Sequence, residues 1–339
     1  MRAAVLHSPG DIRLEDVRKP EAGPGEVLLK VAAVGVCGSD LPRMLIKGAH
    51  KMPLICGHEF SGHIVEIGAG VDGFSMGELV AVPPLIACGT CDQCRRGQFS
   101  RCRNYDYFGS RRDGAYAEFV AVPVSNLLKT PPGLDPRAVA MTDPASIALH
   151  ALWKAGGVTI GARGGVIGCG PIGLFAIQWM RLMGASEVVA IDVSPEKLAQ
   201  AREAGATHTF LATDPLPNDL LCDVIIEAAG HPSSINAAAR QCAPGGHVTF
   251  IGIPVSDVTL EQKTFQHFLR QEISLHGSWN SFGAPFPGPQ WTVALDKLAS
   301  GDLKWEFMIT HDLPLAELPS IFERFKDRSF FFSKVMFRP

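Results

Sequence analysis

The pattern of hydrophobic and polar positions changes near residue 155, which indicates two kinds of structure in one chain. In the first 150 residues, short apolar runs such as residues 26–34 alternate with turn sequences such as Ala22-Gly-Pro-Gly and Pro131-Pro-Gly. Short runs bounded by glycine and proline are typical of strands joined by tight turns. This part of the sequence therefore predicts a compact domain rich in strands and loops.

The second part of the chain alternates strand-like and helix-like segments. An apolar strand at residues 164–168 leads into a helix from Pro171 to Met183, and strands are also predicted at residues 187–192, 223–227, 247–253 and 273–279. Ser194 and Pro195 are typical of the start of a further helix, which Gly205 ends. Strand–helix alternation of this kind predicts a parallel, doubly wound sheet.

Two domains are expected from these patterns, in agreement with a length of 339 residues. Residues 153–287 are expected to form the doubly wound domain and residues 1–152 the β-rich domain. The tail, residues 288–339, mixes both kinds of segment and is expected to return to the first domain. The predicted fold class is therefore α/β with a second, β-rich domain.

Composition and charge narrow the function classes. Hydrophobic residues make up 46% of the chain and charged residues 19%, the balance of a folded globular protein. A net charge of −3 gives no sign of the basic surface that a nucleic acid or an anionic membrane would favour. The N-terminus lacks a signal peptide and no apolar run is long enough to span a membrane, so we expect a cytoplasmic protein. Its nine cysteines are then expected to be reduced, and a cluster among them indicates a metal or catalytic site.

The sequence Gly168-Cys-Gly-Pro-Ile-Gly173 predicts a dinucleotide site, because it fits G-x-G-x-x-G between an apolar strand and a helix. Gly168 permits a tight turn, Gly170 lets the backbone approach a pyrophosphate, and Gly173 allows the helix to pack closely on the strand. Asp192 ends the next strand, where it can accept hydrogen bonds from ribose hydroxyls and would repel a 2′-phosphate, which favours NAD over NADP. A turn that binds no ligand is the alternative. The expected cofactor contacts are Gly168, Gly170, Pro171, Ile172, Gly173, Asp192 and Lys197.

Four cysteines, Cys88, Cys91, Cys94 and Cys102, predict a closed tetrahedral zinc site. Because four protein ligands leave no position for a substrate, the role of this zinc is expected to be structural. A redox-active pair would leave the third and fourth cysteines without a role. An iron–sulfur cluster uses the same ligands but needs a different context.

A second metal site is predicted from Cys37 and His58, which lie about 20 residues apart. A thiolate and an imidazole are good zinc ligands, and a catalytic zinc needs few protein ligands and one open position. A carboxylate is expected to supply the third ligand.

The run from Gly57 to Val71, Gly-His-Glu-Phe-Ser-Gly-His-Ile-Val-Glu-Ile-Gly-Ala-Gly-Val, resembles the signature of the zinc-containing medium-chain alcohol dehydrogenases. The Cys37-Gly-Ser-Asp segment, the four cysteines and the glycine loop follow in that family's order. The resemblance implies a GroES-like β-rich catalytic domain that includes the tail, a Rossmann domain for NAD, and an active site in the cleft between them. It also implies two zinc ions per subunit, one catalytic and one structural, and a homodimer or homotetramer.

The resemblance implies that zinc lowers the pKa of the substrate hydroxyl, that Ser39 accepts its proton and that NAD takes the hydride. Ser39 could instead cap a turn. The family commonly has glutamate where this chain has Asp143, so Asp143 reaches the metal directly, through water, or not at all. Glu59 is the other carboxylate, as a ligand or as a group that orients one. Pro42 stands where many relatives carry a proton-relaying histidine, and His50 is a candidate substitute.

Several segments outside the general scaffold are similar to dehydrogenases of sugar-alcohol phosphates of the galactitol 1-phosphate type: residues 37–43, 48–50, 105–114, 277–280 and 285–288. This similarity implies oxidation of a secondary hydroxyl to give a ketose phosphate. Arg43, Arg111 and Arg112 are candidate phosphate contacts, because guanidinium groups match phosphate oxygens in pairs. They could also be solvated charges. Trp279 is a candidate contact to the sugar chain, with a core or subunit-interface position as the alternative.

Other functions stay open at this stage. The substrate could be an unphosphorylated polyol or amino alcohol, of sorbitol-like, L-idonate-like or threonine-like type. A zinc-free enone or quinone reductase has the same fold, although Cys37, His58 and the four cysteines argue against it. A catalytically silent NAD-binding protein of structural or regulatory function is the alternative from another class.

Overall fold

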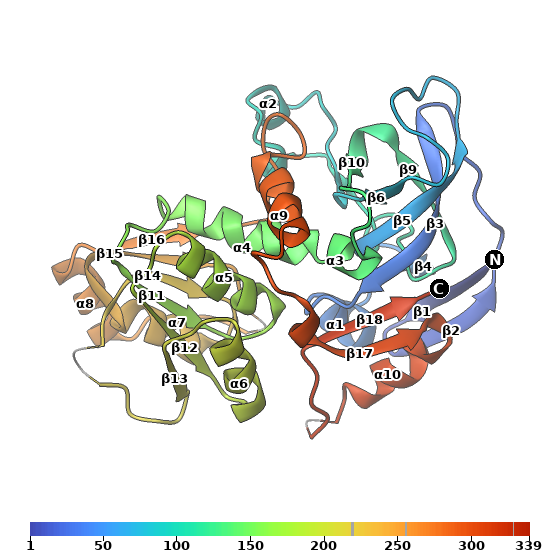
Figure 1. The fold of residues 1–339 in the computed structure, drawn as a ribbon. Coiled ribbons are helices and arrows are strands. Elements are labelled where there is room, and N and C mark those ends of the chain that lie inside the picture. Colours follow the sequence, from blue (N-terminus) through green and yellow to red (C-terminus); the bar gives the residue numbers. More distant parts are fainter. Residues whose placement is uncertain (218–219, 255, 328) are drawn as a thin grey trace. The chain divides into compact units, whose positions relative to one another are not determined.

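The computed structural model describes residues 1–217, 220–254, 256–327 and 329–339 and divides into two compact units. The first unit consists of residues 1–143, 282–300 and 309–339, and the second of residues 144–281 and 301–308. Both ends of the chain lie in the first unit (Figure 1). The tail therefore contributes mainly to the same unit as the N-terminal half.

The second unit has, among its described residues, a six-stranded parallel sheet in the order β13-β12-β11-β14-β15-β16 (Figure 1). This is the strand order of doubly wound nucleotide-binding folds. α5 contacts α6 and α7 contacts α8, as expected where right-handed crossovers place the two pairs of helices on opposite faces of such a sheet. The strands are β11 (Arg163–Ile167), β12 (Glu187–Asp192), β13 (His208–Leu211), β14 (Cys222–Glu227), β15 (Cys242–Phe250) and β16 (Ser274–Gly277). The helices are α4 (Thr142–Lys154), which begins at the end of the first unit, α5 (Pro171–Leu182), α6 (Pro195–Glu203), α7 (Pro232–Arg240), α8 (Gln262–Arg270) and the short η4 (Glu306–Met308).

Most local predictions for this unit are confirmed. β12 has the predicted bounds, and α6 begins at Pro195 with the Ser194 hydroxyl accepting a hydrogen bond from the Lys197 N–H at 3.3 Å. The prediction for β15 was displaced, because the strand begins at Cys242 and ends before Ile251. The Pro-Gly-Gly sequence that resembles a turn is accommodated inside the strand by a shift in its register with β14.

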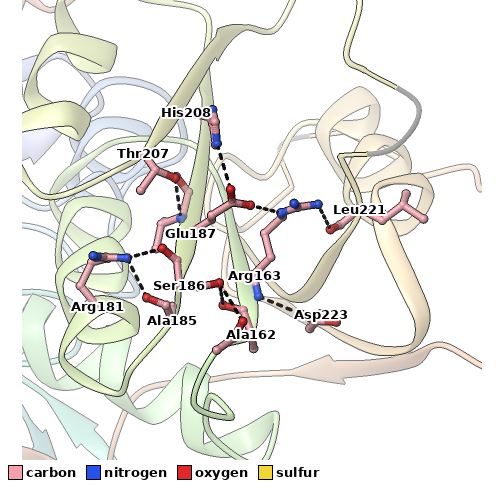
Figure 2. A network of polar contacts seen from close by, with 12 residues as sticks. Ala162, Arg163, Arg181, Ala185, Ser186, Glu187, Thr207, His208, Leu221 and Asp223 are labelled. Atoms are coloured by element: carbon pink, nitrogen blue, oxygen red, sulfur yellow. Dashed lines mark hydrogen bonds and ion pairs between the residues drawn. The ribbon is translucent and has the colours of Figure 1, made fainter.

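A polar network holds the amino-terminal edge of this sheet (Figure 2). Arg163 Nε lies 2.5 Å from Glu187 Oε2, and Arg163 Nη1 donates to the Leu221 carbonyl oxygen at 3.2 Å. The Arg163 main-chain N–H donates to Asp223 at 2.8 Å, and Glu187 Oε1 lies 3.5 Å from His208 Nε2. These residues stand at or beside the starts of β11, β12, β13 and β14. Polar groups thus tie four strands together at this edge, while the glycine loop leaves β11 at the opposite one.

The first unit is built on a mixed sheet in the order β10-β6-β5-β3-β18-β17, with β9 also paired to β3. β18, from the tail, lies antiparallel to β3 and parallel to β17. Leu6, Leu29 and Phe60 share one buried core with Phe322 and Phe337 of the tail. The tail is therefore part of both the sheet and the core of this unit.

The first unit's strands are β1 (Arg2–Ser8), β2 (Asp11–Asp16), β3 (Glu26–Gly35), β4 (Leu54–Ile55), β5 (Glu59–Ile67), β6 (Leu79–Ala81), β7 (Leu85–Ile86), β8 (Asp106–Tyr107), β9 (Phe119–Pro123), β10 (Leu128–Lys129), β17 (Ile309–Pro314) and β18 (Lys334–Arg338). Its helical segments are α1 (Asp40–Pro42), η1 (Arg43–Lys47), α2 (Asp92–Arg95), η2 (Phe99–Arg101), η3 (Val124–Asn126), α3 (Pro136–Ala140), α9 (Pro289–Ala299), η5 (Leu315–Glu317) and α10 (Leu318–Arg324). In the described part of the chain, no helix is long and apolar enough to cross a membrane.

Candidate functional site

Cys37, His58 and Glu59 converge in the first unit. Cys37 follows β3, and His58 and Glu59 lie where β5 begins. β3 and β5 are antiparallel with Gly35 opposite Glu59, so the end of one strand meets the start of the other. One sulfur, nitrogen or oxygen donor from each of the three side chains lies within 4.8 Å of the other two. A thiol, an imidazole and a carboxylate at this spacing are a suitable donor set for zinc.

The carboxylate of Asp40 organises this group of donors. It is fully buried, accepts hydrogen bonds from the Cys37 N–H at 3.1 Å and the Tyr116 hydroxyl at 2.9 Å, and pairs with Arg43 at 2.5 Å. Its Oδ1 also lies 3.5 Å from His58 Nδ1. A carboxylate beside one ring nitrogen orients a histidine so that the other nitrogen faces a metal. Asp40 belongs to the Cys37-Gly-Ser-Asp segment, but its role was not predicted from the sequence.

Charges in this group also shift the pKa values of Cys37 and His58. Burial would raise the pKa of Cys37, but the neighbouring His58 lowers it to about 7. Burial would lower the pKa of His58, but Asp40 and Cys37 raise it to about 10. The metal-free pair therefore favours a thiolate beside an imidazolium, and a bound metal would displace the proton on His58.

Lys334 of β18 completes the environment of Glu59, and sequence reasoning missed it. Lys334 is 1% exposed, forms an ion pair with Glu59 and donates to the Val36 carbonyl oxygen at 3.1 Å. Breaking a buried pair is costly, because the remaining charge stays buried without a partner. The available signal was a lysine that begins an apolar strand sequence, Lys334-Val-Met-Phe.

Asp143 lies outside the group of three donors but within the same electrostatic environment. It is 3% exposed and stands in the first turn of α4. Burial raises its pKa to about 7, with His58 acting to lower the pKa and Cys37 to raise it.

Tyr107 packs edge-on against His58, with ring centroids 5.7 Å apart.

Ser39 stands one residue before Asp40 and is half-buried. Its hydroxyl makes no capping hydrogen bond to α1, and it accepts a contact from Arg43 Nη2 at 3.5 Å. The capping alternative for Ser39 is therefore not realised. The guanidinium of Arg43 is in turn held mainly by Asp40.

The two neighbouring arginines have different surroundings. Arg112 lies 3.7 Å from Asp106 and 3.8 Å from Glu26. Arg111 has no carboxylate partner among the described residues, and its guanidinium lies over the ring of Tyr105, 4.5 Å from the centroid. The Nε of Arg111 is buried without a hydrogen-bond acceptor in the described part of the protein.

His50 and Trp279 are the remaining predicted positions. His50 is exposed and donates its main-chain N–H to the Ser110 carbonyl oxygen at 3.3 Å. Burial and the charges of Arg111 and Arg43 lower the pKa of His50. Trp279 belongs to the second unit and is 53% exposed.

The four cysteines of the predicted structural site also come together. The sulfur atoms of Cys88 and Cys94 are 4.0 Å apart, as are those of Cys91 and Cys102. Sulfur atoms bound to one tetrahedral zinc are about 3.8 Å apart for Zn–S bonds of about 2.3 Å. All four are free thiols, and the backbone N–H groups of Thr90 and Cys91 lower the pKa of Cys88 to about 6. The arrangement thus suits a metal and contains no disulfide.

The glycine loop of the second unit has the geometry expected of a phosphate cradle. Gly168 has φ +95°, and a Cβ on Gly173 would lie 2.0 Å from the Gly168 carbonyl oxygen. A Cβ on Gly170 would meet nothing within 4 Å, so this side of the loop is open where Pro171 and Ile172 begin α5. α5 has no side-chain cap at Gly170, so its first N–H groups are available to an anion.

Asp192 is fixed beside this loop. It accepts the N–H of Cys169 at 2.7 Å and that of Ser194 at 2.9 Å, and it is 8% exposed. Lys197, in the first turn of α6, acts to lower the pKa of Cys169, so its charge also reaches the loop. The predicted cofactor residues are therefore adjacent in the folded unit.

Comparison with known proteins gives consistent results. Residues 23–132 match the alcohol dehydrogenase GroES-like domain, and residues 171–299 match the zinc-binding dehydrogenase domain. The chain is 38% identical to galactitol 1-phosphate 5-dehydrogenase of Escherichia coli K12 over 92% of each protein. It is 31% identical to L-threonine 3-dehydrogenase of Bacillus licheniformis over 94% of each. The crystal structure of galactitol-1-phosphate dehydrogenase from Escherichia coli superposes with a TM-score of 0.94 over the whole of both chains, at 35% identity.

Substitutions of two glycines in this loop should affect stability and cofactor affinity differently. Gly173→Ala should lower the free energy of unfolding by about 3 kcal/mol, because its Cβ would collide with backbone. Gly170→Ala should stay within about 1 kcal/mol of the wild type but weaken NADH binding, because its methyl group occupies the open side of the loop. Thermal unfolding and NADH fluorescence titration measure the two effects. Equal destabilisation by both substitutions would contradict this account of the loop.

Proposed function

Since the chain belongs to the family of zinc-binding alcohol dehydrogenases, we propose that it oxidises a secondary hydroxyl of a sugar-alcohol phosphate with NAD, giving a ketose phosphate. Its relatives include dehydrogenases of polyols and of threonine, so the family alone does not select a substrate. The phosphate is inferred from the surroundings of Arg111.

The catalytic metal would be held by Cys37 and His58, with Glu59 as the carboxylate donor that lies within reach. The four cysteines would hold the structural zinc, and the glycine loop with Asp192 would hold NAD. When bound, the catalytic zinc would act as a Lewis acid on the substrate hydroxyl and NAD would accept the hydride.

The chain's own residues would then bind, orient and move a proton. Asp40 would orient the ring of His58, since its Oδ1 lies 3.5 Å from Nδ1, and Lys334 holds one oxygen of Glu59. The hydroxyl of Ser39 is free of any capping bond to α1, so it can accept the proton of the substrate hydroxyl. Beyond Ser39, Pro42 cannot carry a proton, and His50 is the exposed group that can exchange one with solvent.

One observation carries the phosphate assignment: Arg111 has no carboxylate partner among the described residues. Arg112 is close to two carboxylates and Arg43 is bound to Asp40, so neither is as available to a phosphate as Arg111. A guanidinium with an N–H donor that has no acceptor in the described part of the chain is suited to a phosphoryl group.

The metal assignment predicts two zinc ions per chain. Cys37→Ala should leave one zinc and lower turnover by about a thousandfold or more, because Lewis-acid stabilisation is worth several kcal/mol. Cys94→Ala should also leave one zinc but act mainly by lowering the melting temperature. Elemental analysis, turnover and thermal unfolding of both variants provide the test. A single zinc in the wild type that survives Cys94→Ala would exclude a metal at the four cysteines.

The substrate assignment predicts strong turnover of galactitol 1-phosphate and weak turnover of galactitol and sorbitol. Arg111→Ala should raise KM for the phosphorylated substrate about tenfold to a hundredfold, since a charge-assisted hydrogen bond contributes about 1.5–3 kcal/mol. Its effect on the free polyols should be small. Steady-state kinetics with each substrate measure both quantities.

Arg18→Ala is the matched control, because it removes the same charge from a side chain that is 89% exposed. Equal or better turnover of a free polyol by the wild type would refute the phosphate and favour a sorbitol-like substrate. Preferential turnover of L-threonine would favour an amino-alcohol substrate. A loss of phosphate selectivity in Arg112→Ala with none in Arg111→Ala would show that the wrong arginine is assigned.

The cofactor assignment predicts a preference for NAD that depends on the charge of Asp192. Asp192→Asn keeps an oxygen that can accept a backbone N–H but removes the charge that would repel a 2′-phosphate. The ratio of kcat/KM for NADP to that for NAD should rise about tenfold, since repulsion between like charges at close range is worth about 1 kcal/mol or more. An unchanged ratio, or a wild type that prefers NADP, would contradict the assignment.

A further inference from the structure

We propose that Tyr105 is a positioning residue that sets selectivity for phosphorylated substrates by holding the guanidinium of Arg111 over its ring. This inference rests on the proposed function, because it concerns the group that would recognise the phosphate. Tyr105 is itself assigned no contact with the substrate or with the reacting atoms.

The contact between the two side chains leaves the binding edge of Arg111 unused. The Arg111 guanidinium carbon lies 4.5 Å from the centroid of the Tyr105 ring. Such a contact uses the face of the guanidinium, whereas its N–H donors lie in its plane. Because one of these donors, Nε, has no acceptor in the described part of the chain, the stacked side chain retains capacity for an anion.

Tyr105 can act as a platform because other aromatic side chains fix it. It packs edge-on against Tyr107, with ring centroids 6.3 Å apart, and Tyr107 in turn contacts His58. Both tyrosines pack on a cluster that contains the buried Phe282 and Trp291. The ring under Arg111 is therefore tied on one side to the candidate metal site.

The loop that carries the four cysteines, residues 88–102 (the four-cysteine loop), contacts the other side of the cluster. Phe99 of this loop packs against Phe286, with ring centroids 5.5 Å apart, and Phe286 stacks on Phe282, with ring centroids 5.8 Å apart. The Ser100 N–H and hydroxyl both donate to the Phe282 carbonyl oxygen, at 3.2 and 3.1 Å. The four-cysteine loop thus forms part of the support on which Tyr105 and Arg111 rest.

A fixed guanidinium binds an anion more tightly than a mobile one. An arginine that must be immobilised on binding loses side-chain entropy at that step, whereas a stacked arginine has lost it already. Loss of the ring should therefore weaken phosphate binding about threefold to tenfold. The chemical step should not change, because Tyr105 does not contact the donors at Cys37 and His58.

The test compares Tyr105→Leu, which removes the ring, with Tyr105→Phe, which keeps it. In Tyr105→Leu, KM for galactitol 1-phosphate should rise about threefold to tenfold at unchanged kcat, with KM for galactitol unaffected. Inorganic phosphate should inhibit galactitol oxidation competitively, and its inhibition constant should rise by the same factor. Tyr105→Phe should behave like the wild type in both measurements.

Two further variants keep the test decisive. Arg111→Lys leaves the aromatic cluster intact but lacks the planar group, so it should reproduce the loss even if Tyr105→Leu does not fold. Phe74→Leu is the matched control, because Phe74 lies under Lys129, at 5.1 Å, in another cation–aromatic pair of the same unit. It should leave both constants unchanged.

The outcomes separate this inference from the proposed function. A wild type that prefers galactitol 1-phosphate, with constants unchanged in Tyr105→Leu but raised in Arg111→Lys, would overturn the role of Tyr105 alone. Constants unchanged in both variants would overturn the role of Tyr105 and the assignment of the phosphate to the guanidinium of Arg111. A loss in Tyr105→Phe as large as in Tyr105→Leu would overturn it too, since the hydroxyl and not the ring would then be responsible. A wild type with neither phosphate preference nor phosphate inhibition would overturn both proposals.

Discussion

The candidate catalytic site depends on a single buried carboxylate, that of Asp40. A fully buried charge is tolerated only where partners replace its hydration, and Asp40 has the Cys37 N–H, Arg43 and the Tyr116 hydroxyl. Meeting this requirement fixes the backbone at Cys37 and directs an oxygen towards His58. The partners that make the charge stable are thus also the contacts that shape the donor group.

Glu59 is a second buried carboxylate that needs a partner of opposite charge, and the tail of the chain supplies it. Lys334 lies 275 residues beyond Glu59 in sequence, yet β18 inserts next to β3 and buries the lysine against that carboxylate. The last strand of the chain therefore extends the sheet of the first unit beyond β3 and also supplies the charge that neutralises Glu59.

Sequence was informative wherever one short segment determines the geometry. The glycine loop, the four cysteines and β12 were all predicted, because spacing along the chain sets which atoms meet. The pairing of Lys334 with Glu59, and that of Tyr116 with Asp40, join segments far apart in sequence, and no local pattern specifies them. The bounds of β15 were missed because a local pattern was misleading. The sequence indicated a turn, but pairing with β14 keeps this segment inside the strand, with a shift in register.

Arg111 and Arg112 show most clearly what sequence cannot supply. They are adjacent and identical in type, and each lies over an aromatic ring, but only Arg112 has carboxylate neighbours among the described residues. The surroundings of each side chain, and not its charge, decide which arginine is available to a ligand. The metal donors are organised by buried charges, whereas Arg111 rests on an aromatic cluster that contains none of those donors. Tyr107 is the one member of the cluster named above that also contacts a donor, His58, so Tyr105 and Arg111 are linked to the metal donors through a single aromatic contact of that set.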